Sequence, residues 1–190
     1  MDDQAEYRTA EERHVQEVIY WATLALQLPA AGVHKVFPTE DSCRMRLAGV
    51  RWPDGIRCPA CQSEEVFELS TRPVFKCRAC KIQFSATSGT SLHRSHVPTL
   101  LWFLAAEKMI QGYAQAYCRY HTPSEYLAET IGVSYRSAFR MRRVILGDVA
   151  ASGKGLLRKS ICIGGFSLPS ELTLGSEEHA IWLQQKVIFG

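Results

Sequence analysis

The hydrophobic and polar positions of the first fifty residues recur with helical spacing. They predict one helix over about 8–28, which Pro29 and Gly32 are expected to end. A second, shorter helix is expected over about 40–50, because Thr39 is a suitable N-cap residue there. The N-terminal part of the chain is therefore predicted to be helical.

The pattern changes to that of short β-strands in the next segment. β-forming residues alternate or cluster over 65–69, 74–76 and 81–85, with turn residues at 51–55 and 70–73. These runs predict a small three-stranded antiparallel sheet. A piece of about 35 residues buries too little apolar surface to fold alone, so it needs a further source of stability.

Two C-x-x-C pairs, Cys58 with Cys61 and Cys77 with Cys80, flank that sheet and are separated by fifteen residues. Each short turn directs two thiolates at one point, and a hairpin brings the two points together. The spacing predicts a closed Cys₄ site for one structural zinc ion, whose binding contributes on the order of 10 kcal/mol. Iron in a rubredoxin-like site and four cysteines without metal remain as alternatives.

Helical spacing returns after the sheet. A helix is expected to begin near Pro98 and Thr99 and to end at Gly112, followed by an irregular connector over 113–122. A last amphipathic helix is expected over 177–188. Its apolar residues Ile181, Trp182 and either Val187 or Ile188 are expected to pack on the N-terminal helix or, as the less favoured alternative, on a second subunit.

Residues 124–145 have the layout of a helix-turn-helix. A short helix is expected over 124–130, Gly132 suits the turn, and Ser134 suits the N-cap of the second helix. Ala138, Met141 and Ile145 form the buried stripe of that second helix. The residues expected to contact DNA are Ser134, Tyr135, Arg136, Ser137, Arg140, Arg142 and Arg143. The alternative is that these arginines form the solvated face of an ordinary bundle helix.

Charge is strongly segregated, although the net formal charge is only +3. Residues 1–41 hold three basic and eight acidic residues, whereas 72–159 hold fourteen basic and four acidic ones. A basic middle between acidic ends favours a polyanionic partner. Three basic residues of the ribbon, Lys76, Arg78 and Lys81, are expected to contact phosphate.

The composition is that of a soluble globular protein, with 46% hydrophobic and 22% charged residues. We find no run of about 20 apolar residues that would span a membrane and no secretory signal, and we expect a cytoplasmic, nucleoid-associated protein. His93 and His96 form an H-x-x-H pair without further ligands, so polar loop residues near DNA are expected there rather than a second metal site.

Several motifs together resemble the N-terminal half of bacterial insertion-sequence DDE transposases. They are Phe-Pro-Thr-Glu-Asp at 37–41, Arg-Trp-Pro-Asp-Gly-Ile-Arg-Cys-Pro-Ala-Cys at 51–61, Phe-Lys-Cys-Arg-Ala-Cys at 75–80, Gln-Phe-Ser-Ala-Thr-Ser-Gly-Thr at 83–90 and Gly-Val-Ser-Tyr at 132–135. The resemblance covers about 36–146, with a longer connector at 113–123. It implies a zinc ribbon and a helix-turn-helix, followed in the family by a nuclease domain of the RNase H type.

The family's catalytic pattern does not continue after residue 146. A DDE nuclease holds two metal ions with three carboxylates. Residues 161–165 are similar to the family's first catalytic strand, and that alignment puts Lys159 where the family has its first catalytic Asp. The 44 residues that follow Leu146 are too few for an RNase H sheet. We therefore expect no catalytic residues and no enzymatic activity.

The sequence thus predicts an α+β chain with flanking N- and C-terminal helices. Its expected parts are an N-terminal interaction or dimerisation helix (1–36), a zinc ribbon with a leading helix (37–90), a helix-turn-helix domain (91–146) and a C-terminal remnant of a catalytic domain (147–190). The expected function is that of a transposase-derived, catalytically inactive regulator of transcription that binds double-stranded DNA, with a homodimer as a candidate form. The alternatives are a truncated transposase that inhibits transposition and a zinc-ribbon adaptor that binds another protein.

Overall fold

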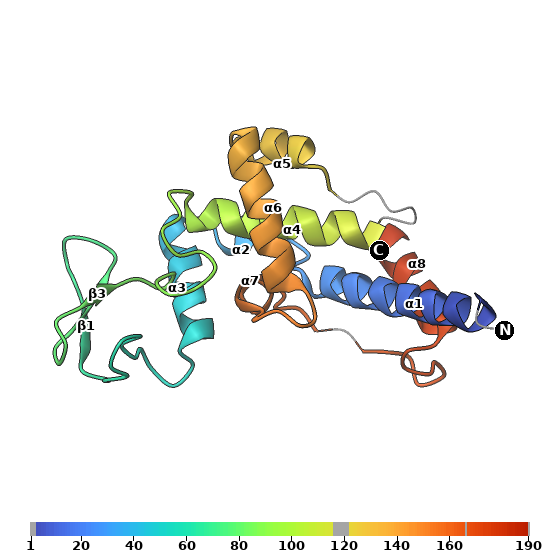
Figure 1. Cartoon of the computed structure of the whole chain (residues 1–190), viewed down its shortest axis with the longest axis horizontal. Coiled ribbons are helices and arrows are strands. Elements are labelled where there is room, and N and C mark those ends of the chain that lie inside the picture. The colour runs from blue at the N-terminus through green and yellow to red at the C-terminus, as the bar shows by residue number, and fades with distance from the viewer. Residues whose placement is uncertain (1–2, 116–121, 166, 190) are drawn as a thin grey trace.

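The computed structural model describes residues 3–115, 122–165 and 167–189, with the backbone alone for 3–11. Helices and a small sheet follow one another in the order α1 (Asp3–Gln27), α2 (Val33–Val36), α3 (Glu40–Arg51), β1 (Val66–Glu68), β2 (Phe75–Cys77), β3 (Gln83–Phe84), α4 (Thr99–Gln115), α5 (Ser124–Ile131), α6 (Tyr135–Val149), α7 (Leu156–Ile161) and α8 (Glu177–Phe189). The sheet lies at one end of the molecule, and α1 and α8 lie at the other (Figure 1). The predicted α+β class is confirmed.

The sheet is antiparallel with strand order β1-β2-β3, as predicted. Phe75 in the central strand pairs with Glu68 on one side and with Phe84 on the other. Its strands are two or three residues long, so hydrogen bonding in the ladder contributes little to its stability.

The helical part of the molecule is built around α4, which contacts every other helix of the described chain. Its sequence is apolar on nearly all sides, as expected of a helix that is covered all round. Six of its apolar side chains are almost fully buried: Trp102, Phe103, Ala105, Ala106, Met109 and Ile110.

Gly112 does not end α4, which was the expectation from the sequence. The helix continues to Gln115, and Gly112 lies within it. A Cβ atom at this position would collide with the hydroxyl of Thr122. The glycine is therefore needed for close packing of the chain that enters α5, and not for a turn.

Carboxylates from distant parts of the chain cap buried helix N-termini in this fold. Glu40 accepts hydrogen bonds from the N–H groups of Thr99 and Leu100, at 2.8 and 2.9 Å, and so caps α4. Glu107 lies in the middle of α4 and accepts one from the N–H of Val33 at 2.8 Å, at the start of α2. A carboxylate at a helix N-terminus satisfies unpaired N–H groups and complements the helix dipole.

Residues 161–165 do not form the strand that the resemblance implied. Ile161 ends α7, and 162–165 have no regular structure. Asp148 causes this difference, because its carboxylate accepts from the N–H groups of Leu156 and Leu157, at 3.1 and 2.7 Å, and starts a helix there. The following segment lies on the end of α1, where the N–H of Gly164 donates to the carbonyl of Gln27 at 2.8 Å.

The C-terminal helix α8 packs on α1 and α4 within the monomer. The residues that it buries are His179, Ala180 and Leu183. Ile181 and Ile188, which were among the candidates for packing, stay exposed, because they lie on the other side of the helix. No helix of the described chain is long and apolar enough to cross a membrane.

Replacing Glu40 with Ala is expected to destabilise the protein by about 1–2 kcal/mol, because two N–H groups at the start of α4 lose their acceptor. The matched control is Asp41→Ala, one position further on, whose 77% exposed side chain forms a surface ion pair with Arg44. Urea unfolding of the zinc-loaded protein measures both. Equal midpoints for the two variants would show that the cap does not stabilise α4.

Candidate metal centre and nucleic-acid interface

The four predicted cysteines converge on one point beside the sheet. The sulfur atoms of Cys58, Cys61, Cys77 and Cys80 all lie within 4.8 Å of one another. The Cys58 and Cys80 sulfurs are 3.5 Å apart, and those of Cys61 and Cys77 are 3.6 Å apart. Sulfur ligands at zinc–sulfur bond length in a tetrahedron lie about 3.8 Å apart. The donor set therefore fits a zinc ion with four thiolate ligands.

The two C-x-x-C turns share one backbone pattern. The N–H of Gln62 donates to the carbonyl of Cys58 at 2.9 Å, and the N–H of Lys81 donates to that of Cys77 at 3.1 Å. Gln62 and Lys81, which follow the second cysteine of each pair, both have left-handed backbone conformations, with φ of 61° and 64°. Two turns of the same shape thus present their thiols to a common centre.

Backbone N–H groups prepare the site for negative charge. The N–H of Cys80 points at the Cys77 sulfur from 3.5 Å and lowers the pKa of the Cys77 thiol to about 6. At Cys80 the N–H of Ile82 favours the thiolate, but burial and the three neighbouring sulfurs outweigh it and raise the pKa to about 12. Four thiolates this close need a cation, and a zinc ion supplies the compensating charge.

The small core of the ribbon connects directly to the helical core through Trp52. This ring packs edge-on against Phe75 and Phe84, with centroid distances of 6.1 and 5.8 Å. Trp52 also packs against the large core around α4. The Arg51 guanidinium stacks on the Trp52 ring at 4.4 Å and donates to the carbonyl of Ala86 at 2.8 Å. These contacts hold the ribbon in one orientation on α3.

The three basic residues predicted to contact phosphate from the ribbon differ in their surroundings. Lys76 is half-buried in the central strand, whereas Arg78 and Lys81 are exposed. The Arg78 guanidinium lies over the ring of Phe67 at 5.2 Å. Arg78 and Lys81 flank Cys80, so bound zinc would fix the backbone that carries them.

Helices α5 and α6 are joined by a tight turn, at the positions expected from the sequence. Gly132 is left-handed, with φ of 71°, and its N–H donates to the carbonyl of Ala128 at 3.0 Å. The hydroxyl of Ser134 accepts from the N–H of Ser137 at 3.2 Å and caps α6. Buried Leu127 and Ile131 on α5 face the predicted stripe on α6, and both helices rest on α4.

Most residues predicted to contact DNA line the open side of α6. Six of them, namely Ser134, Tyr135, Arg136, Ser137, Arg140 and Arg143, are exposed or half-buried along it. Arg142 is different, because its guanidinium donates to the carbonyl of Thr122 at 3.0 Å and to the hydroxyl of Tyr113 at 3.2 Å. It secures the chain before α5 to α6.

One large exposed side chain of α6 is absent from the sequence-based set. Phe139 is 55% exposed and lies 6.3 Å, between ring centroids, from Tyr135, which is 54% exposed. The signal that would have found it is its place four residues after Tyr135, between Arg136 and Arg140, on the side away from the buried stripe. The open side of α6 is therefore both cationic and aromatic.

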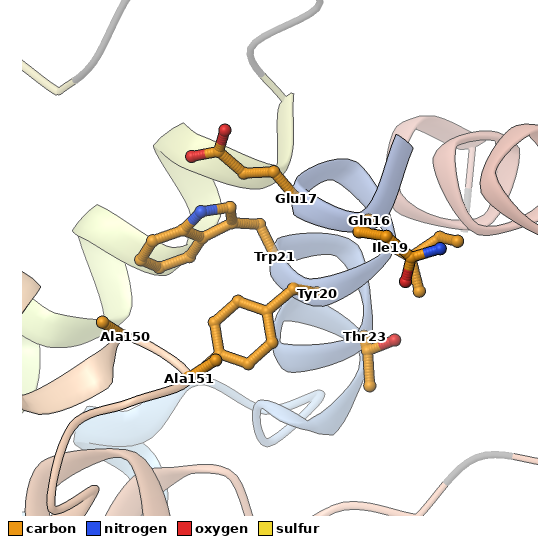
Figure 2. Close-up of a pocket in the computed structure, with 8 residues that line it drawn as sticks. All are labelled: Gln16, Glu17, Ile19, Tyr20, Trp21, Thr23, Ala150 and Ala151. Carbon is orange, nitrogen blue, oxygen red and sulfur yellow. The ribbon is translucent and has the colours of Figure 1, made fainter. Parts of the chain in front are cut away.

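A cavity of about 560 Å³ lies elsewhere, against α1. Figure 2 shows the rings of Tyr20 and Trp21 extending from α1 toward Ala150 and Ala151. The Tyr20 hydroxyl is engaged, because it donates to the carbonyl of Val149 and accepts from Arg158 at 2.6 Å. Glu17 is the one carboxylate in the lining.

The histidine pair after the ribbon does not gather a third ligand. In the part of the chain that the structure describes, the four cysteines are the one group of three or more residues able to hold a metal ion. The Nδ1 atom of His93 accepts from the N–H of Gly89 at 3.2 Å. His93 thus lies in a loop, with one ring nitrogen occupied by the backbone.

Replacing Cys58 with Ser is expected to abolish stoichiometric zinc binding, since a hydroxyl is a poor substitute for a buried thiolate ligand. Native mass spectrometry should find one zinc ion in the wild type and none in the variant. Circular dichroism should retain most of the helical signal, because the core around α4 holds no ligand. Cys162→Ser is the control and should keep its zinc ion. The assignment is contradicted if the Cys162→Ser variant loses zinc or if the Cys58→Ser variant retains it.

Comparison with known proteins agrees with this geometry. Residues 38–83 match the family described as the transposase zinc-ribbon domain. A protein of Halobacterium salinarum, described as an uncharacterized protein in transposable element ISH50, is 32% identical over 109 residues. The match takes in 56% of this chain and 34% of the relative, so the chain spans about a third of that protein's length. No solved structure matches. The segment 38–83 is thus a zinc ribbon of the transposase type.

Proposed function

We propose that this chain is a transposase-derived protein that binds double-stranded DNA through α5 and α6 as a helix-turn-helix and regulates transcription. The observation that carries the proposal is the open side of α6, where Arg136, Arg140 and Arg143 follow a capped N-terminus and a left-handed glycine turn. A helix of this kind enters the major groove with its N-terminal residues at the base edges.

The residues of α6 divide into two kinds of contact. Arg136 and Arg140 lie in the first half of the helix and are proposed to pair with guanine edges. Arg143 lies further along and is proposed to contact a phosphate, as are the hydroxyl residues near the start, Ser134 and Ser137. Tyr135 contributes an exposed ring at the same edge.

Arg142 does not belong to this proposed set. Its guanidinium is already held by the carbonyl of Thr122 and the hydroxyl of Tyr113. Turning toward DNA would break both hydrogen bonds and leave partly buried groups unsatisfied. Its proposed contribution is to position the start of α5 relative to α6.

The ribbon is proposed to add phosphate contacts beside the major-groove helix. Arg78 and Lys81 are exposed next to zinc ligands, and Lys76 is half-buried in the central strand. The excess of basic residues over 72–159 supports a polyanionic partner. A transposase-type ribbon on the same chain supports DNA over other polyanions.

Catalytic inactivity is part of the proposal. Glu107 and Asp148 are two of the four acids in the basic segment, and both cap helix N-termini. Lys159, at the position that the resemblance assigns to a catalytic Asp, lies in a helix and cannot ligate a divalent cation as a carboxylate does. These residues do not assemble a two-metal site.

Packing of α8 on α1 and α4 supports a dedicated regulator acting on cellular promoters at the nucleoid. A second candidate function is inhibition of transposition by occupation of element ends, which the relative from a transposable element favours. A homodimer is proposed as the binding form, since exposed Ile181 and Ile188 are available on α8. Mapping of bound DNA across the host genome separates the two functions, because promoters and element ends are different sites.

Arg136→Ala and Arg140→Ala are each expected to weaken binding to a selected preferred duplex by about 1–3 kcal/mol, with relaxed specificity at one base pair. Arg143→Ala is expected to weaken binding to all duplexes. It should also reduce the slope of the logarithm of the binding constant against the logarithm of salt concentration by about one. Lys35→Ala, an exposed cation on α2, is the control. Fluorescence anisotropy at several salt concentrations measures these effects, and unchanged binding by all three arginine variants refutes the assignment of α6.

Purified zinc-loaded protein is expected to neither cleave nor join DNA in the presence of Mg²⁺ or Mn²⁺. The physical reason is the lack of three convergent carboxylates on the described residues. Gel assays on duplexes that the protein binds provide the measurement, with a DDE nuclease as the positive control. Metal-dependent strand cleavage by the pure protein overturns the proposed inactivity.

A further inference from the structure

A second cationic feature lies away from the open side of α6, in a cavity of about 290 Å³. Three segments far apart in the sequence line it: the end of α3, the loop after the ribbon, and the stretch from the end of α6 through α7. The residues that line it are Val50, Arg51, Gly89, Thr90, Ser91, Asp148, Lys154, Leu156 and Lys159. None of its cations was singled out from the sequence as a DNA contact.

The cations of this cavity have no carboxylate partner. Within the described ranges, no ion pair is formed by Arg51, Lys154 or Lys159. Asp148 also lines the cavity, but its two oxygens accept from the N–H groups at the start of α7. Burial raises the pKa of the Asp148 carboxyl, whereas the N–H groups at the start of α7 and the nearby Arg158 lower it. The lining therefore holds three cations and one carboxylate, so positive charge is in excess.

Arg51 is held in place by an aromatic ring and a backbone carbonyl. Its guanidinium stacks on Trp52 at 4.4 Å and donates through one terminal nitrogen to the carbonyl of Ala86 at 2.8 Å. The other terminal nitrogen faces Gly89 in the cavity wall, where the lack of a side chain leaves the approach open. Burial lowers the pKa of this guanidinium, which shows that part of its hydration is lost without a counter-charge.

Lys154 and Lys159 complete the arrangement from the other side. Both side chains are exposed at the rim, and the exposed hydroxyl of Ser91 lies with them. A fixed guanidinium with two mobile ammonium groups and a hydroxyl is a donor set suited to phosphate oxygens.

We propose that the cavity between α3, the loop after the ribbon and α7 is a phosphate-binding site formed by Arg51, Lys154 and Lys159. The phosphate comes either from the DNA backbone or from a small soluble phosphate compound. In the first case the site adds a contact to the DNA backbone beyond those of α6 and the ribbon. This possibility rests on the proposed DNA binding. In the second case it stands independently of that proposal.

The test uses the zinc-loaded full chain and the double variant Lys154→Gln/Lys159→Gln. Both side chains are exposed and form no hydrogen bond with the part of the chain that the structure describes, so this variant is expected to fold normally. The control, Lys35→Gln/Lys186→Gln, removes the same charge from exposed positions on α2 and α8. Circular dichroism and native mass spectrometry verify that all three proteins are folded and retain zinc.

Inorganic pyrophosphate is the probe for a soluble phosphate compound. At constant ionic strength it is expected to raise the melting temperature of the wild type and of the control in a saturable manner. The pocket variant should bind it about tenfold more weakly or show no shift. This outcome assigns the site to a soluble phosphate if duplex binding is unchanged in the variant.

Duplex binding at several salt concentrations is the probe for backbone phosphate. The pocket variant is expected to weaken binding to preferred and unrelated duplexes alike, and to reduce the salt slope by about one relative to the control. If the wild type binds no duplex, the proposed function fails while the pyrophosphate experiment still decides the site. The proposal is overturned if the pocket variant and the control behave alike in both experiments.

Discussion

The architecture depends on the burial of α4, which contacts every other helix of the described chain. A helix covered on all sides offers its neighbours apolar contacts, but its N-terminal N–H groups and any polar side chain within it must then find partners inside the protein. Glu40 meets the first requirement by capping α4 from α3. Glu107 meets the second by accepting from the start of α2. The Glu107 carboxylate also stabilises the start of α2, and this helps to explain why a helix of only four residues forms there.

In the ribbon, zinc is the main source of stability, because the sheet is too small to stabilise itself. The metal replaces a hydrophobic core, and the few aromatic side chains there serve mainly to attach the ribbon to the helices. Trp52 belongs to both cores, and Arg51 packs on it. The ribbon and α6 are consequently fixed relative to one another, which under the proposed function would allow two separate basic surfaces to meet one DNA molecule.

The segregation of charge along the chain has a structural basis. The buried acids of the basic segment, Glu107 and Asp148, are satisfied by helix N-termini, so they do not neutralise the surface. Arg142 turns inward to backbone and tyrosine oxygens, whereas Arg136 and Arg140 stay on the open side of the same helix. Positive charge thus remains available where a polyanion can reach it.

Local chemistry let the sequence determine the zinc ligands, the cap at Ser134 and the turn at Gly132, because these features depend on residues within a few positions of one another. Only the tertiary structure decided features that join distant segments. Gly112 lies within a helix because Thr122 packs against it, and 156–161 is helical because Asp148 caps it. The convergence of cations around the cavity beside α7 likewise follows from packing, which hydrophobic periodicity and cap spacing do not encode.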